Sequence, residues 1–235
     1  MSVQIKPIGP DVYEVRGEHK MSAGWFFPLR TVIARTPTGG LWVHSPLRLE
    51  DSLAAEVDAL GAVEFLIAPS NLHHLYMQPW KGRWPSAKMI GARGLRKKRP
   101  DLVFDATLDE HPEMPGFETV FVDGAPTLGE SVFFHVASKT LICTDLMFNL
   151  GPANTRGFLT PWILRMANAY GRPAQSRLVR MATKDRERAG HSVRRILEWP
   201  FERIAMAHGD IVETDAKATL TTACQWMLEG ASAAV

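Results

Sequence analysis

The chain has 235 residues, of which 46% are hydrophobic and 22% charged, as in ordinary globular proteins, and this length suits one large α/β domain or two small ones. Its 27 Lys and Arg residues nearly balance 25 Asp and Glu residues, which argues against nucleic acid or an acidic membrane as the main partner. Cys143 and Cys224 stand far apart with no CxxC pair, so neither a disulfide framework nor a thiolate zinc knuckle is expected. Residues 1–11 lack the pattern of a signal peptide and no apolar run could span a bilayer, so we predict a cytoplasmic protein without membrane segments.

The first third of the chain predicts strands with one helix. Alternating or β-branched runs predict strands at 11–16, 30–35 and 41–44, the last two joined as a hairpin across the turn formers of 36–40. Apolar residues at helical spacing predict a helix over 49–60, closed by Gly61. A short apolar strand over 63–68 ends at Pro69 and leads into a polar loop.

The remaining chain predicts five more strands and two helical segments. Strands are expected at 87–90 and 117–122, followed by a hairpin of 131–136 with 140–144. An Arg-rich helical segment covers about 157–199, with breaks at Pro161, at 171–173 and at Gly190. A last strand over 203–207 precedes a closing helix over 216–228.

Three of these strands run directly into potential metal ligands. The strand over 63–68 leads to His73 and His74, the strand over 140–144 to Asp145, and the strand over 203–207 to His208. Strands of layered α/β proteins position functional groups in the loops beyond their carboxyl ends. Imidazole and carboxylate are ligands that Zn, Mn and Fe(II) accept. The pattern therefore predicts a metal site assembled from distant strand ends.

These segments resemble the metallo-β-lactamase superfamily. The hairpin SVFFHVASKTLICTDLMF is similar to the superfamily segment that ends in a bridging aspartate, and AHGD is similar to its last histidine motif. The loop PSNLHHLY occupies the place of the His-x-His-x-Asp-His motif, and PLRTVIARTPTGGLWVHSPLRL and IAPSNLHHLYMQPW resemble a domain-of-unknown-function branch of the superfamily. The resemblance implies an αββα four-layer sandwich, as a single domain over 1–235, with its metal site at one edge of the sheets.

The resemblance leaves the ligand set incomplete. It places Asn71 at the first motif histidine, His73 at the second, Leu75 at the aspartate and Tyr76 at the last histidine, and Gly124-Ala125 stands where a further histidine is expected. The retained ligands are His73, Asp145 and His208, with His74 as a candidate fourth and Asn71 as a weaker candidate. Neighbouring side chains of an extended loop point apart, so His73 and His74 face one ion only if the loop turns there.

Three protein ligands and a water suffice for one metal ion but not for a two-metal clamp. The resemblance thus implies a hydrolase with one divalent ion, zinc being favoured over Mn or Fe, that cleaves a small-molecule ester, thioester or amide and uses His73, Asp145 and His208. The missing ligands argue against β-lactamase activity itself. Leu75 and Tyr76 favour an alternative, a non-catalytic and metal-free protein that binds a small molecule or protein at the same place. A third alternative, a nucleic-acid-processing enzyme, depends only on the basic run 93–99, which the near-neutral total charge favours as a solvated turn.

Other chemistry-bearing residues have simpler interpretations. His44 and His135 lie on predicted strands, where we expect them to form local hydrogen bonds. Cys143 is expected to pack in the core, as buried free cysteines commonly do. The Arg-rich helices over 177–195 include Asp185 and Glu187, which predicts a salt-bridged surface.

Overall fold

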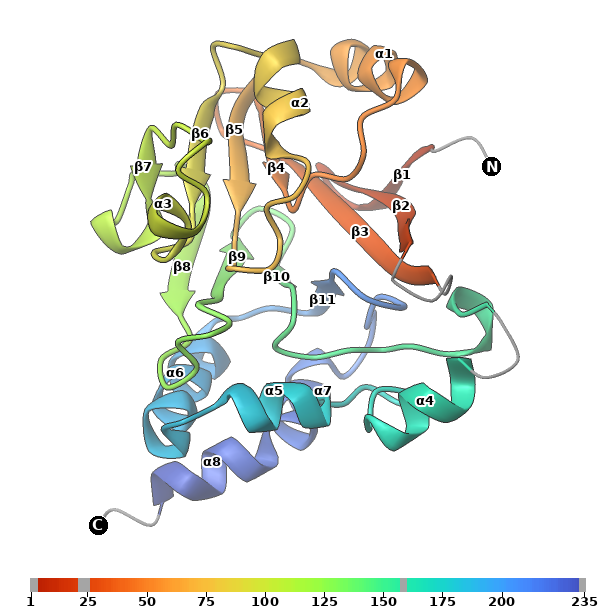
Figure 1. Cartoon of the computed structure of the whole chain (residues 1–235), viewed down its shortest axis with the longest axis vertical. Helices are drawn as coiled ribbons and strands as arrows, with labels where there is room; N and C mark the ends of the chain where they lie inside the picture. Colours follow the sequence, from red (N-terminus) through yellow and green to blue (C-terminus); the bar gives the residue numbers. More distant parts are fainter. Residues whose placement is uncertain (1–3, 21–25, 157–159, 233–235) are drawn as a thin grey trace.

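Two β-sheets pack face to face between two layers of helices in the computed structural model, which describes residues 4–20, 26–156 and 160–232 (Figure 1). The helices of the first half of the chain cover one sheet, and those of the second half cover the other. This arrangement is the four-layer αββα sandwich that the sequence predicts.

The first sheet follows chain order within the described residues, from β1 (Ile5–Gly9) through β2 (Val12–Lys20), β3 (Phe26–Arg35), β4 (Leu41–His44), β5 (Val63–Ala68) and β6 (Lys88–Gly91) to β7 (Ala106–Thr107). The first four strands pair antiparallel, and β4 to β7 pair parallel. The predicted hairpin of 30–35 with 41–44 is therefore confirmed.

The second sheet has the order β11-β10-β9-β8, formed by β8 (Phe117–Phe121), β9 (Ser131–His135), β10 (Thr140–Cys143) and β11 (Arg203–Met206). The hairpin of β9 and β10 is antiparallel, as predicted, whereas β11 lies parallel to β10. Because β10 and β11 run in the same direction, their carboxyl ends meet at one edge of the sheet.

Alternation along the strands assigns side chains to the layers. In β4, Trp42 packs between the two sheets, whereas Leu41 and Val43 pack against the first helical layer. In β10, Ile142 faces the space between the sheets, whereas Leu141 and Cys143 face the second helical layer. Strands with both faces buried carry apolar residues at every position, which explains why these runs are continuous rather than alternating.

The first helical layer contains α1 (Asp51–Leu60), α2 (Met77–Arg83) and α3 (Leu95–Lys98), and short 3-10 turns lie at Leu108–Glu110 and Pro152–Asn154. The second layer contains α4 (Thr160–Met166), α5 (Arg177–Ala182), α6 (Arg186–Glu198), α7 (Ala216–Ala223) and α8 (Gln225–Ser232). In the described residues, no helix combines the length and the apolar character that crossing a membrane requires.

Two details of the helical prediction are wrong. The helix α6 continues through Gly190 instead of breaking there. Glycine serves packing at this position, since α6 crosses α8 so closely that a Cβ would lie 2.3 Å from the backbone oxygen of Met227. The predicted closing helix is divided at Cys224 into α7 and α8. The first three residues of the predicted Arg-rich segment, 157–159, lie outside the described residues.

Candidate metal centre

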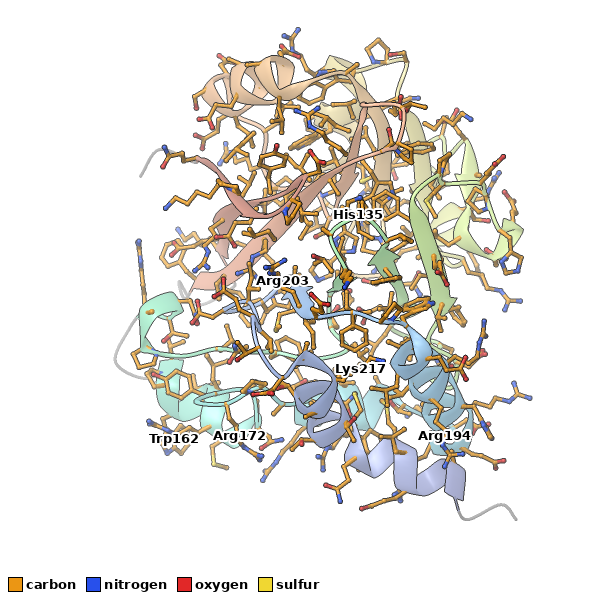
Figure 2. All side chains as sticks on the ribbon, turned by 180° about the vertical axis from the view of Figure 1, so that it is seen from behind. His135, Trp162, Arg172, Arg194, Arg203 and Lys217 are labelled. Carbon is orange, nitrogen blue, oxygen red and sulfur yellow. The ribbon has the colours of Figure 1, made fainter. Side chains whose placement is uncertain are left out.

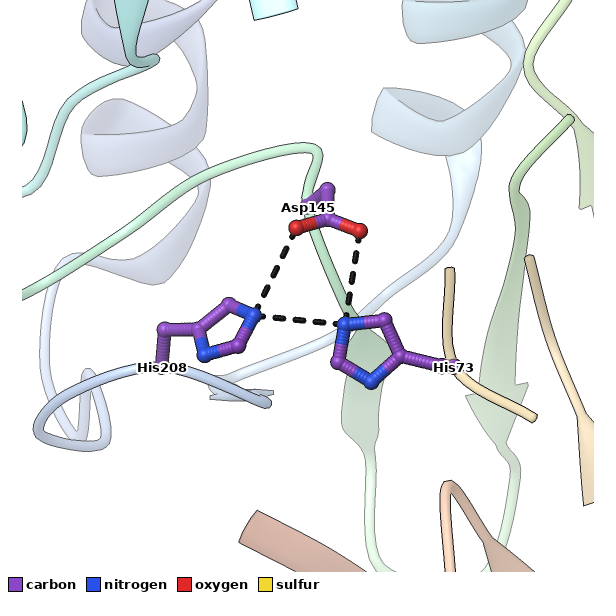
Figure 3. Close-up of side chains that lie close together, drawn as sticks. All are labelled: His73, Asp145 and His208. Carbon is purple, nitrogen blue, oxygen red and sulfur yellow. Dashed lines mark hydrogen bonds and ion pairs between the residues drawn. The ribbon is translucent and has the colours of Figure 1, made fainter. Parts of the chain in front are cut away.

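The three predicted ligands meet at the edge where the strands end. His73 lies in the loop after β5, Asp145 follows β10 and His208 follows β11 (Figure 3). One donor atom from each lies within 4.8 Å of the others. The side chains are 7%, 8% and 2% exposed, respectively, so the cluster is nearly enclosed.

Local structure fixes the two loops that carry the histidines. After Pro69, the Ser70 hydroxyl accepts hydrogen bonds from the backbone amides of Leu72 and His73, and this turn aims His73 at the cluster. At Gly209, φ is +97°, and a Cβ there would lie 2.0 Å from the backbone oxygen of Asn149. Glycine is therefore required directly after His208.

The separations of the donor atoms suit a single tetrahedral ion. The Nε2 atoms of His73 and His208 lie 3.2 Å apart, and each lies 3.4 Å from an oxygen of Asp145. Ligands about 2.0–2.1 Å from a tetrahedral zinc ion lie about 3.3 Å from one another. The Oδ2 atom of Asp145 is buried, and in the described protein it has no polar partner besides Nε2 of His73 at 3.4 Å, as expected of an oxygen reserved for a cation.

The other ring nitrogens are occupied outside the cluster. His208 donates from Nδ1 to the carbonyl oxygen of Pro28 at 2.8 Å, and Nδ1 of His73 lies 2.7 Å from the Ser45 hydroxyl. Burial lowers the pKa of His208, against the opposing effect of Asp145, so its neutral form carries its free lone pair on Nε2. Such outer hydrogen bonds orient metal-binding histidines in proteins.

Glu130 holds the backbone beside Asp145, a role that was not predicted from the sequence. Its buried carboxylate accepts hydrogen bonds from the backbone amides of Thr144 and Asp145, at 2.6 and 3.1 Å. Burial, and then repulsion by Asp145, raises the pKa of Glu130 to about 7. The hairpin register pairs Thr140 with His135. Extending that register by five residues places Glu130 opposite Asp145, so the predicted hairpin contained the signal.

Asp145 itself remains ionised. Burial alone would raise its pKa, but the charge of His73 and hydrogen bonding to both histidines outweigh burial and hold the pKa below its usual value. A carboxylate that stays charged in a nearly closed cluster gives the site a buried negative group beside the two imidazoles. This is the electrostatic environment that a divalent cation requires.

A buried ion pair holds the strand that carries His208. Arg30 is 2% exposed and donates from Nε to Glu14 at 2.6 Å. Its two terminal nitrogens donate to the backbone oxygens of Met206 and Gly209, on either side of His208. The guanidinium therefore clamps the turn at the end of β11, a role that the sequence did not indicate.

The structure does not bring His74 or Asn71 to the cluster. Arg99 donates to Nδ1 of His74 at 2.9 Å on the other side of the loop, as expected where neighbouring side chains diverge. Burial, with the nearby charges of Lys98 and Arg99, lowers the pKa of His74 to about 4. Asn71 instead donates to the backbone oxygens of Pro126 and Thr127, which ties two loops together.

The positions where the superfamily pattern is missing hold no replacement ligand. Ala125 is buried and its carbonyl accepts turn hydrogen bonds from Leu128 and Gly129. Leu75 is half exposed, and the Tyr76 hydroxyl lies 2.9 Å from Nδ1 of His19.

The basic run 93–99 forms α3 and its flanks, with ion pairs from Arg93 to Asp109, from Arg96 to Glu110 and from Arg99 to Asp101. It is therefore largely neutralised, as the solvated-turn interpretation requires. Cys143 packs in the core, where burial raises the pKa of its thiol well above the usual value.

A cavity of about 410 Å³ lies beside the loop that carries His208. Pro28, Arg30, Ala207 and Gly209 line it on the side of that loop, and Arg16, Glu18 and the 153–156 segment line the rest. None of the three cluster residues lines this cavity. The cavity therefore lies beside Arg30 and Gly209, which hold the His208 loop, and not beside the cluster itself.

Comparison with solved structures places this arrangement among known folds. The metallo-β-lactamase from Hirschia baltica is 9% identical, with a TM-score of 0.65 over 97% of this chain and 98% of that one. The mono-zinc form of the metallo-β-lactamase FIM-1 from Pseudomonas aeruginosa is 11% identical, with a TM-score of 0.63 over 98% and 97%. A fragment of diflavin flavoprotein A 5 from Nostoc sp. PCC 7120 is 12% identical, with a TM-score of 0.63 over 97% of both chains.

No protein-family model and no curated protein sequence matches the chain. Identities this low establish the architecture alone, and they agree with the resemblance drawn from the strand-end motifs. The chain has the metallo-β-lactamase fold over nearly its whole length.

Proposed function

We propose that this protein is a metal-dependent hydrolase that binds one divalent ion, with zinc favoured, through His73, Asp145 and His208. The main support is that the Nε2 atoms of both histidines and the Asp145 carboxylate oxygens lie 3.2–3.4 Å from one another. The Nδ1 atoms of both histidines have partners outside the cluster. One ion at this point would act as a Lewis acid and acidify a water molecule near neutral pH.

The residues of the chain have distinct parts in this proposal. Asp145 supplies the negative charge of the site and stays ionised, while His208 stays neutral and keeps its lone pair directed inward. Ser45 and the Pro28 carbonyl hold the two imidazole rings, and Glu130 holds the backbone of Asp145. The substrate class proposed is a small ester, thioester or amide.

Metal analysis of the purified protein tests the proposal directly. We expect about one equivalent of zinc in the wild type and almost none in His208→Ala or Asp145→Asn. His74→Ala is the matched control, because this histidine is adjacent to a proposed ligand but faces Arg99, and it should keep the metal. Thermal denaturation of each variant separates loss of metal from loss of fold.

Equal and negligible metal in the wild type and in His208→Ala would refute the proposal. It would favour the alternative, a metal-free protein that binds a ligand at the same place. One observation supports this alternative: the three side chains lie close enough to share a proton and are almost closed to solvent. Hydrolysis abolished by a chelator would in turn rule the alternative out.

A further inference from the structure

The helices α4 and α5 carry an unusual combination of exposed residues. Five basic residues and no acidic residue lie between positions 160 and 184. Half of the exposed large apolar residues of the described chain lie on the same two helices: Trp162, Ile163, Met166, Leu178 and Met181. We call these five residues, with Arg165, Arg172, Arg177, Arg180 and Lys184, the α4–α5 surface.

The apolar members project into solvent instead of packing. Trp162 is 63% exposed, Leu178 70% and Met181 71%, while Leu164 and Val179 turn inward and anchor the two helices in the core. Contiguous exposed apolar side chains rarely occur on soluble proteins without an interaction to serve.

Hydrogen bonds join the end of α4 to the start of α5. The backbone amide of Arg177, the first residue of α5, donates to the oxygen of Ala167 at 2.8 Å, just after the end of α4. Asn168 reinforces this junction by donating to the oxygen of Gln175 at 3.0 Å. Figure 2 shows the labelled Trp162 and Arg172 at the outer edge of the helical layer.

In the part of the chain that the structure describes, no ion pair joins the basic members to a carboxylate. Among the described residues, the nearby acids pair with cations of α6 instead, Asp185 with Arg188 and Glu229 with Arg186. Arg165 and Arg180 lie over the rings of Tyr170 and Trp226, which leaves their charge uncompensated. The salt-bridged surface predicted over 177–195 is thus found on α6 but not on α5. The near-neutral total charge conceals this segregation.

The chemistry of the surface selects its occupant. A second copy of the chain in a two-fold pair would bring the same uncompensated cations together. Nucleic acid would engage the arginines but leave Leu178 and Met181 exposed, because phosphate contacts require no aliphatic side chains. An anionic lipid surface satisfies both kinds of group, with apolar side chains entering the interface and cations meeting headgroups. We propose that the α4–α5 surface binds membranes that contain anionic phospholipid.

Vesicle co-sedimentation of the full-length protein tests this proposal. Vesicles of phosphatidylcholine with about 30% phosphatidylserine should bind the protein, whereas pure phosphatidylcholine should bind it far less. Raising NaCl from about 0.05 to about 0.5 M should weaken binding strongly. The variant Arg172→Gln/Arg177→Gln should bind about 30-fold more weakly, from loss of two interfacial charges. Leu178→Ser/Met181→Ser should also weaken binding, including at low salt.

The matched control is Arg48→Gln/Lys97→Gln, which removes two exposed cations outside the surface and should bind like the wild type. Equal binding of the wild type to both kinds of vesicle would overturn the proposal, as would equal losses in the control. Tight binding to duplex DNA that the aliphatic variant retains would assign the surface to nucleic acid. A dimer in sedimentation velocity that Leu178→Ser/Met181→Ser dissociates would assign it to a second copy of the chain.

Discussion

His44 and His135 form a natural matched pair for testing how burial and hydrogen bonding determine stability. Both are strand histidines, 0% and 1% exposed. His135 has partners on both ring nitrogens, the Ser138 hydroxyl at 2.8 Å and the Arg35 carbonyl at 3.0 Å, as the sequence predicted. His44 has none in the described protein, so the same prediction is wrong for His44. It packs between Trp42 and Phe133 instead.

We therefore expect opposite effects of the same substitution. A buried polar group without a partner costs about 1–3 kcal/mol, and replacing it removes that cost. The larger ring of phenylalanine overpacks the site, which offsets about 1 kcal/mol of the gain. His44→Phe should leave the free energy of unfolding unchanged or raise it by up to about 2 kcal/mol. His135→Phe loses two hydrogen bonds worth about 1 kcal/mol each and leaves the Arg35 carbonyl without this partner. It should therefore lower the free energy of unfolding by about 2 kcal/mol or more.

The pH dependence gives a second measure. Burial, and then repulsion by His73, lowers the pKa of His44 well below 6.5. Below pH 6.5 the unfolded chain therefore binds a proton that the folded chain refuses, and stability falls by up to about 1.4 kcal/mol per pH unit. This contribution is absent above pH 6.5, and His44→Phe should remove it below that pH.

Urea denaturation followed by tryptophan fluorescence at pH 7.5 and pH 5.5 measures all three proteins, with chelator present to exclude metal binding. A loss of more than about 2 kcal/mol in His44→Phe would refute the reasoning, because it would show that the ring nitrogens make contributions that the packing does not account for. The reasoning would also be refuted if the free energy of unfolding changed with pH equally in this variant and in the wild type.

Three further substitutions test the supports of the fold and of the cluster. Gly190→Ala forces a Cβ against the backbone of α8 and should lower the free energy of unfolding by about 2 kcal/mol or more in the same denaturation assay. Arg30→Met leaves Glu14 with a single cation and frees the turn after β11, so a loss of about 3–5 kcal/mol is expected in thermal and urea denaturation. Glu130→Ala leaves two buried backbone amides unpaired and should cost about 2–5 kcal/mol, and zinc titration of the folded fraction should show weakened binding.

The sequence predicted those elements whose pattern was continuous and clearly bounded. The strands β4 and β5 begin and end at the predicted residues, because apolar runs there are bounded by turn formers and proline. The strand β1 was missed since Pro7 and Gly9 disfavour a strand within its five residues. The helix α2 was missed for a similar reason, because Pro79 and Gly82 interrupt its seven residues.

The candidate site was predictable to the level of strand ends but not of side-chain direction. Parallel pairing of β10 with β11 brings Asp145 and His208 to one edge, which the strand-end pattern anticipates. Which of His73 and His74 faces that edge depends on the turn made by Ser70, a contact between backbone and side chain with no periodic signature. The role of Arg30 could not be predicted either, because it depends on hydrogen bonds to residues nearly 180 positions away.

The energetic cost of the supports argues that the cluster serves a purpose. Each proposed ligand has its own buried polar support: Ser45 for His73, Glu130 for Asp145, and Arg30 with the Pro28 carbonyl for the His208 turn. Buried charges of this kind commonly lower stability relative to apolar side chains of similar volume. If the cluster had no function, apolar side chains at this edge would make the protein more stable. Ala125 is an example of such a buried apolar residue in this chain. Three ligand positions are kept and supported, whereas Leu75 and Ala125 put apolar side chains at others, and this uneven loss favours the proposed single-ion site over a relic of two.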